Sequence, residues 1–123
     1  MTHAHGNAFQ AAQALREFLD HRHGPVLTAC ASDRDGGVTL VLTLVSGEDR
    51  KNTPPQYFAD LARRIRHRFA SIQVEIYSLS SAEYKLLAMS GVDGVTMFQE
   101  TYNPAVYADY HLSGPKRDYD NRI

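Results

Sequence analysis

Two hydrophobic patterns alternate along this chain: short, nearly continuous apolar runs, and apolar residues about 3.6 positions apart. The order of these patterns predicts the order of strands and helices. Residues 38–45, 72–79 and 92–98 are short runs rich in β-branched and aliphatic side chains. Runs of this kind are typical of strands that are covered on both faces. Residues 26–31 form a fourth, shorter candidate strand, and the composition of residues 33–37 predicts a turn after it.

Between these strands, apolar residues recur at a spacing of about 3.6 residues and predict helices. The first of these helices begins with Thr53 as its N-cap, with Pro54 at the first helical position and Gln56 completing a capping box. The face opposite its apolar stripe is basic, and we expect that face to be solvated rather than bound to nucleic acid. The apolar stripe consists of Phe58, Leu61, Ala62, Ile65 and Phe69.

The next helix is marked at both ends. Ser80 and Glu83 form a second capping box, and Gly91 is the expected stop. The residues that we expect to face inward are Tyr84, Leu87 and Ala88.

A third, short helix is expected over residues 104–110, with Asn103 as its N-cap and a proline at its first position. Tyr107 and Tyr110 are interpreted as packing residues, and a turn at residues 114–115 follows. An earlier amphipathic helix is expected over residues 8–21, ahead of the first candidate strand.

From residue 38 onward the order is therefore strand and helix three times over, which predicts an α/β fold with a parallel sheet. The carboxyl ends of the three strands then lie at one edge, and polar groups at three separate strand ends indicate a binding site. This edge collects Ser46, Gly47, Glu48, Tyr77, Gln99, Glu100 and Tyr102.

Glu75 is a further candidate, because a carboxylate inside a buried run is costly unless it is paired. The alternative is an outward position opposite an arginine.

Composition narrows the function classes. The chain has 123 residues and a net charge of −1, so nothing draws it toward nucleic acid or acidic lipid. No apolar run is long enough to span a membrane, and no signal-peptide pattern precedes it, so we expect a cytoplasmic protein. The single Cys30 excludes an intrachain disulfide and any thiolate metal site made by this chain alone. We interpret Cys30 as a small buried residue, and the histidine pairs at 3 and 5 and at 21 and 23 as weak metal candidates.

Four stretches of the chain resemble the radical S-adenosylmethionine tyrosine lyases. They are Leu44-Val-Ser-Gly-Glu48, Val74-Glu-Ile-Tyr-Ser-Leu79, Asp93-Gly-Val-Thr-Met-Phe-Gln-Glu-Thr-Tyr102 and His111-Leu-Ser-Gly-Pro-Lys-Arg-Asp-Tyr119. The third and fourth stretches are the most specific. The resemblance covers residues 38–123, whereas residues 1–37 match poorly and form a separate N-terminal helix and connecting segment. The branch that acts in thiamine biosynthesis fits best, and the branch that matures iron hydrogenase remains an alternative.

The resemblance implies a partial TIM-type (β/α) barrel of three to four βα units with parallel strands. It implies that Ser46, Gly47 and Glu48 hold the amino group of S-adenosylmethionine, a group that suits a carboxylate. Gln99 and Glu100 would then lie near the cofactor, and Tyr77 and Tyr102 near the substrate tyrosine. The parent reaction cleaves the Cα–Cβ bond of tyrosine to give 2-iminoacetate and p-cresol.

The chain departs from the family in one respect that bears on activity. The family's Cys-x3-Cys-x2-Cys motif, which binds a four-iron four-sulfur cluster, has no counterpart beside Cys30. We therefore expect no cluster and no lyase activity from this chain alone. A non-catalytic half-barrel that binds S-adenosylmethionine or associates with itself is the alternative, since residues 38–45 and 92–98 would both be edge strands.

Overall fold

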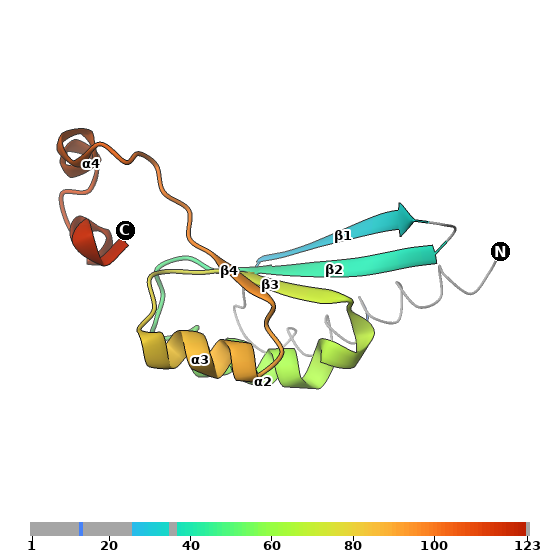
Figure 1. Ribbon diagram of the computed structural model, residues 1–123. Helices are drawn as coiled ribbons and strands as arrows, with labels where there is room; N and C mark the ends of the chain where they lie inside the picture. Colours follow the sequence, from blue (N-terminus) through green and yellow to red (C-terminus); the bar gives the residue numbers. More distant parts are fainter. Residues whose placement is uncertain (1–12, 14–25, 35–36, 123) are drawn as a thin grey trace.

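The computed structural model describes residues 13, 26–34 and 37–122. They include one sheet with α2 and α3 on one side of it and α4 beyond its end (Figure 1). The four strands lie in the order β1-β2-β3-β4. Their bounds are Val26–Arg34, Gly37–Val45, Ser71–Glu75 and Gly94–Thr96. The helices are α2 (Pro55–Ile65), α3 (Ser81–Met89) and α4 (Pro104–Tyr110), with 3-10 turns η1 (Arg66–Arg68), η2 (Pro115–Arg117) and η3 (Asp120–Arg122).

Strands β2, β3 and β4 run parallel, as the alternation of strand and helix predicts. The last two are shorter than expected. β3 ends at Glu75, and β4 covers only three residues of the expected run 92–98. At the start of that run, the Asp93 carboxylate accepts a hydrogen bond from the Ile72 N–H at 2.8 Å. A side-chain hydrogen bond thus replaces one backbone hydrogen bond between the two strands. Beyond Thr96 the chain leaves the sheet toward α4 (Figure 1).

The hairpin of β1 and β2 corrects two expectations. β1 extends through Arg34, and its last two residues, Asp33 and Arg34, pair with Val38 and Gly37 instead of forming a turn. The pairing is antiparallel and places Val26 beside Val45. Residues 38–45 are therefore not an edge strand, because the backbone N–H and C=O groups on the side of β2 away from β3 are paired with β1. Except for residue 13, the expected helix over residues 8–21 lies outside the described residues, and so do the histidine pairs.

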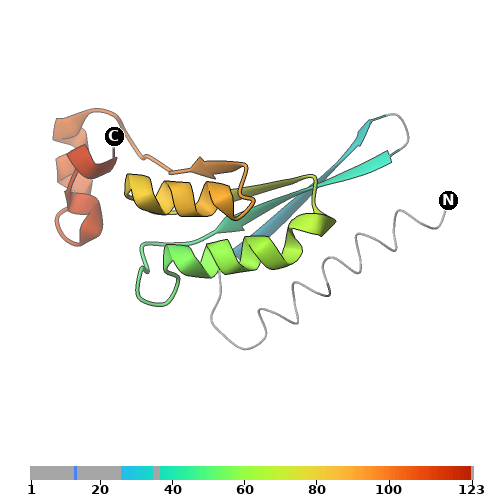
Figure 2. The same ribbon diagram turned by 60° about the horizontal axis from the view of Figure 1, so that its bottom comes forward.

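The core lies between the sheet and the two helices α2 and α3, which cover the same face (Figure 2). Alternate residues of β2 and β3 point into it, as the period of two along a strand requires. The expected apolar stripe of α2 is buried throughout, and Leu87 is the buried residue of α3. Tyr84 and Ala88 are exposed, so the expectation that they face inward was wrong. The side of α3 that contacts the sheet is narrow and has Leu87 as its buried residue. The fully buried strand residues are Leu42, Leu44, Ile72 and Val74.

The start of α2 differs from the expected capping box. The N-cap is Pro54, and no side chain caps the helix. The Thr53 hydroxyl instead donates to the Asp49 carbonyl at 2.8 Å and contacts the Ser46 hydroxyl at 2.8 Å. Thr53 is buried, and its oxygen is thus used to close the loop between β2 and α2.

The ends of α3 and the start of α4 follow the expected chemistry. Ser80 and Glu83 form the reciprocal capping box, and Gly91 adopts a φ of +94° just past the helix, a conformation that favours glycine. Asn103 caps α4 by accepting the N–H groups of Ala105 and Val106 at 3.0 and 3.2 Å.

The part of the chain after the sheet, residues 97–122, is called the C-terminal arm below. It carries α4, η2 and η3 beyond the carboxyl ends of the strands, away from α2 and α3 (Figure 1). Tyr107 is buried in it and its hydroxyl donates to the Lys116 carbonyl at 2.6 Å. Tyr110 is 75% exposed, so its assignment as a packing residue was wrong. The expected turn at residues 114–115 is present, with Gly114 at a φ of +78°.

Candidate functional site

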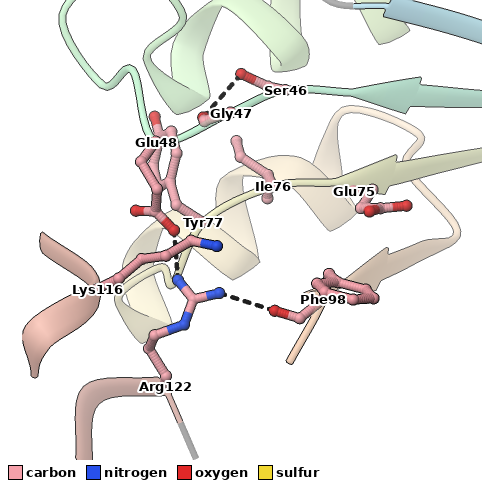
Figure 3. A pocket seen from close by; sticks show the side chains of 9 residues that line it. All are labelled: Ser46, Gly47, Glu48, Glu75, Ile76, Tyr77, Phe98, Lys116 and Arg122. Atoms are coloured by element: carbon pink, nitrogen blue, oxygen red, sulfur yellow. Dashed lines mark hydrogen bonds and ion pairs between the residues drawn. The ribbon is translucent and has the colours of Figure 1, made fainter. Parts of the chain in front are cut away.

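A cavity of about 330 Å³ lies at the edge where the parallel strands end (Figure 3). Parallel strands gather their carboxyl ends at one edge, so residues far apart in sequence meet there. Its wall combines two carboxylates, two cations and two aromatic rings. The lining residues are Ser46, Gly47, Glu48, Glu75, Ile76, Tyr77, Phe98, Lys116 and Arg122.

Arg122 connects the strand ends of this site. Its guanidinium makes a short ion pair with the Glu48 carboxylate after β2 (Figure 3). It also donates to the Phe98 carbonyl at 2.8 Å and to Gln99 Oε1 at 3.4 Å, both beyond β4. Arg122 is 5% exposed. The ends of β2 and β4 are thus joined through one buried cation, and the expected meeting of Glu48 with the Gln99 region at one edge is observed.

Sequence reasoning missed Arg122 altogether. It stands 74 residues from Glu48, in a polar Asp-Asn-Arg triplet without periodicity. No local signal points to it, because Glu48 is only half-buried and two other cations, Arg50 and Lys51, stand much closer to it in the chain.

The loop after β2 presents Glu48 through a set of short contacts. Ser46 Oγ lies 3.1 Å from the Gly47 carbonyl and 2.8 Å from Thr53 Oγ1. A side chain at position 47 would meet nothing within 4 Å, so Gly47 is not required by crowding within the described residues. The loop is closed by the Thr53 N–H, which donates to the Asp49 carbonyl at 2.9 Å. These contacts hold Ser46, Gly47 and Glu48 at the cavity wall.

Tyr77 lies in the wall with its hydroxyl already engaged. It is 3% exposed, and its O–H donates to the Thr53 carbonyl at 2.7 Å. The Arg50 guanidinium lies over its ring at 4.6 Å, and burial raises the pKa of the Tyr77 hydroxyl. The ring, rather than the hydroxyl, is therefore the part that Tyr77 offers to a ligand.

Glu100 is held on the arm instead of in the cavity wall. Its two carboxylate oxygens contact Lys116 Nζ at 2.7 Å and His111 Nε2 at 3.2 Å. The hydrogen bond from Lys116 lowers the pKa of the Glu100 carboxyl to about 2. Tyr102 is 74% exposed, and its carbonyl accepts the Tyr119 hydroxyl at 2.7 Å. The structure thus brings Ser46, Gly47, Glu48 and Tyr77 into one wall, reaches Gln99 through Arg122, and keeps Glu100 and Tyr102 outside that wall.

Glu75 lies half-buried in the cavity lining, at the end of β3. Its backbone carbonyl accepts the Ser46 N–H at 2.9 Å, which ties β3 to the loop that presents Glu48.

Two further properties of the described residues bear on the site. They contain no group of three or more histidine, cysteine, aspartate or glutamate side chains arranged to hold a metal ion. In the same part of the chain, no helix has the length and apolar character needed to cross a membrane.

Comparison with known proteins gives two curated relatives. The 2-iminoacetate synthases of Salmonella typhimurium and Escherichia coli are 42% and 41% identical over 82 residues, which are 67% of this chain. The chain spans 22% of the length of each relative. No family model matches the chain. The chain therefore resembles a fragment of 2-iminoacetate synthase, which agrees with the lyase resemblance carried by its four stretches.

Proposed function

We propose that residues 38–123 form three consecutive βα units of a radical S-adenosylmethionine tyrosine lyase barrel, with residues 1–37 as a separate segment. On this proposal the cavity at the strand ends binds the methionyl part of S-adenosylmethionine. One observation carries it: the Glu48 carboxylate, the Phe98 carbonyl and Gln99 Oε1 converge on one buried cation. The similarity to two 2-iminoacetate synthases supports this branch of the family.

The chemistry of these acceptors fits an ammonium group. An ammonium has three N–H donors, and charge-assisted hydrogen bonds to a carboxylate are the stronger kind. Ser46 and Gly47 would place the Glu48 carboxylate, because the contacts of their loop fix it at the wall. Gln99 would add its Oε1 to the ammonium acceptors, Glu100 would lie toward the ribose, and Tyr77 would form the wall beside the substrate. Tyr102, an exposed ring, would take part in substrate binding only where further barrel surface faces it.

The iron–sulfur cluster that the resemblance implies does not fit the residues of this chain. Such clusters are held by cysteine thiolates, and the chain has one cysteine. The proposed role of this chain is therefore to bind and orient the S-adenosylmethionine methionyl group, without radical chemistry of its own. Anaerobic reconstitution followed by iron and sulfide analysis checks this point: we expect no stoichiometric cluster, and one cluster per chain would contradict it.

Binding of S-adenosylmethionine tests the proposal most directly. Isothermal titration calorimetry would compare the wild type with Glu48→Gln, which keeps the shape of the side chain and removes its charge. We expect at least about tenfold weaker binding, since a hydrogen bond to a charged group contributes about 1.5–3 kcal/mol. Asp109→Asn removes the same charge at an exposed position of α4 and is the matched control. An absence of heat from the wild type, or equal affinities for all three proteins, would refute the proposal.

A self-associating half-barrel is the second candidate, and the sheet favours it. The face of β2 and β3 away from α2 and α3 carries half-buried side chains, among them Val41 and Val45. β4 is the last strand of the described sheet, so its outer edge can pair with another chain. Size-exclusion chromatography separates the candidates: self-association shows an apparent mass that rises with concentration, whereas a monomer at all concentrations contradicts it.

A further inference from the structure

The Arg122 guanidinium lies where the proposed ligand would place its ammonium. It donates to three oxygens: the Glu48 carboxylate, the Phe98 carbonyl at 2.8 Å and Gln99 Oε1 at 3.4 Å. These three oxygens are called the acceptor cradle. Glu48 follows β2, whereas Phe98 and Gln99 follow β4 at the start of the C-terminal arm and Arg122 belongs to η3 at the end of that arm.

The cradle is suited to one cation at a time. The Arg122 side chain is 4% exposed in its ion pair with Glu48, whereas the Glu48 side chain is 25% exposed, so the cation is the more deeply buried partner. Lys116 also lines the cavity, but its ammonium pairs with Glu100 at 2.7 Å. A ligand ammonium could donate to the same Glu48 oxygen, the Phe98 carbonyl and Gln99 Oε1 together only after the guanidinium has left, because the guanidinium lies among these three acceptors.

The segment that delivers Arg122 is held by polar contacts. Within η3, Arg122 is the buried residue, and the other two positions are an aspartate and an asparagine. The turn is tied to the rest of the molecule by the Tyr119 hydroxyl, which donates to the Tyr102 carbonyl at 2.7 Å, and by a short hydrogen bond from the Ser78 hydroxyl to the Asn121 carbonyl. Moving η3 away would break hydrogen bonds without exposing the apolar core. Segments of this kind open locally at a small cost in free energy.

We propose that Arg122 is an internal competitor that occupies the ammonium subsite, and that a ligand ammonium and the guanidinium bind the acceptor cradle in mutually exclusive states. This inference rests on the proposed function of the cavity. The apparent affinity for S-adenosylmethionine is then reduced by the fraction of molecules in which the cradle is open. If the guanidinium fills the cradle in about nine molecules out of ten, its removal strengthens binding about tenfold.

Calorimetry of S-adenosylmethionine binding to Arg122→Ala tests whether removal of the guanidinium strengthens binding. We expect about tenfold tighter binding than to the wild type. Arg117→Ala is the matched control, because it removes the same charge from an exposed position five residues earlier. The control is expected to bind within about twofold of the wild type, since long-range charge effects at the surface are screened. Unchanged or weaker binding by Arg122→Ala would overturn the inference, since it would make the guanidinium neutral toward the ligand or a partner of it.

A second measurement uses the wild type alone and decides the matter if Arg122→Ala does not fold or no protein binds S-adenosylmethionine. The Arg122 Nε–H proton NMR signal is followed while methylammonium chloride or tetramethylammonium chloride is added. Both salts add the same charge, but tetramethylammonium has no N–H to donate. A signal change with methylammonium alone supports the exclusion, even where the lack of S-adenosylmethionine binding refutes the proposed function. Equal responses to the two salts overturn it.

Discussion

The helix-covered sheet and the C-terminal arm are stabilised in different ways. The sheet buries a continuous apolar cluster between β2, β3, α2 and α3. In the arm, by contrast, Tyr107 and Arg122 are the buried side chains among the described residues, and ion pairs and hydrogen bonds at Glu100, Lys116 and Tyr119 connect its turns. Apolar burial stabilises in proportion to area, whereas exposed polar contacts contribute little each. The molecule thus joins a rigid scaffold to a more easily opened segment, and the candidate site lies where they meet.

Truncating one large aromatic ring in each region should give the largest effects on stability. The two variants should also show whether the sheet and the arm unfold independently. Phe58→Ala removes a fully buried ring of the sheet core and is expected to lower the free energy of unfolding by about 3–5 kcal/mol. Tyr107→Ala removes the buried ring of the arm and is expected to open the arm while the sheet remains folded.

Urea unfolding followed by circular dichroism measures the first effect, and amide hydrogen exchange in α4 measures the second. Met89→Ala, at an exposed position of α3, is the control. If Tyr107→Ala lowered the stability of the sheet as much as Phe58→Ala does, the two regions would form one cooperative unit and the comparison would fail.

Removal of equivalent caps should have smaller effects, each confined to one region. Ser80→Ala removes the cap of α3 and Asn103→Ala the cap of α4. Each cap contributes about 1 kcal/mol. We expect the urea midpoint to fall for Ser80→Ala, and hydrogen exchange in α4 alone to speed up for Asn103→Ala. A shift of the global midpoint by Asn103→Ala would contradict the separation.

Acid should produce the smallest effect, below about 1 kcal/mol for a pair of this exposure. The hydrogen bond from Lys116 lowers the pKa of Glu100 from 4.5 to about 2. A depressed carboxyl pKa stabilises the folded arm above pH 4.5, and this contribution is lost as the pH falls from 4.5 toward 2. Hydrogen exchange in α4, compared at neutral pH and within that window, should show the loss in the wild type. Glu100→Gln should lack this acid-dependent step, and a step of equal size in that variant would exclude Glu100 as its cause.

The sheet could be predicted from sequence because its signals are local and periodic. The runs that became β2 and β3 are rich in β-branched and aliphatic residues, and the stripe of α2 repeats at helical spacing. The Asn103 cap was predicted for the same reason, since a cap acts within three residues. The Thr53 cap was not realised, because its hydroxyl is used by Asp49 and Ser46 in the preceding loop, and local propensity does not weigh such competing partners.

The site could be predicted only in part. Ser46, Gly47 and Glu48 stand directly after a strand, where topology alone places them at the edge of the sheet. Arg122 could not be located in this way, since its position depends on the path of the whole arm. The antiparallel direction of β1 was also missed, because strand periodicity carries no information on direction. Direction and long-range pairing are decided by tertiary packing.

The direction of β1 limits how this sheet can be enlarged. Its first residue, Val26, lies beside Val45 at the strand ends that carry the candidate site, and the hairpin turns back at the far edge. A closed ring of strands that all run one way cannot include a neighbour of opposite polarity next to β2. Additional parallel strands would therefore have to attach along β4, or take the place of β1. While the hairpin is in place, the parallel part of the sheet can therefore grow only along β4.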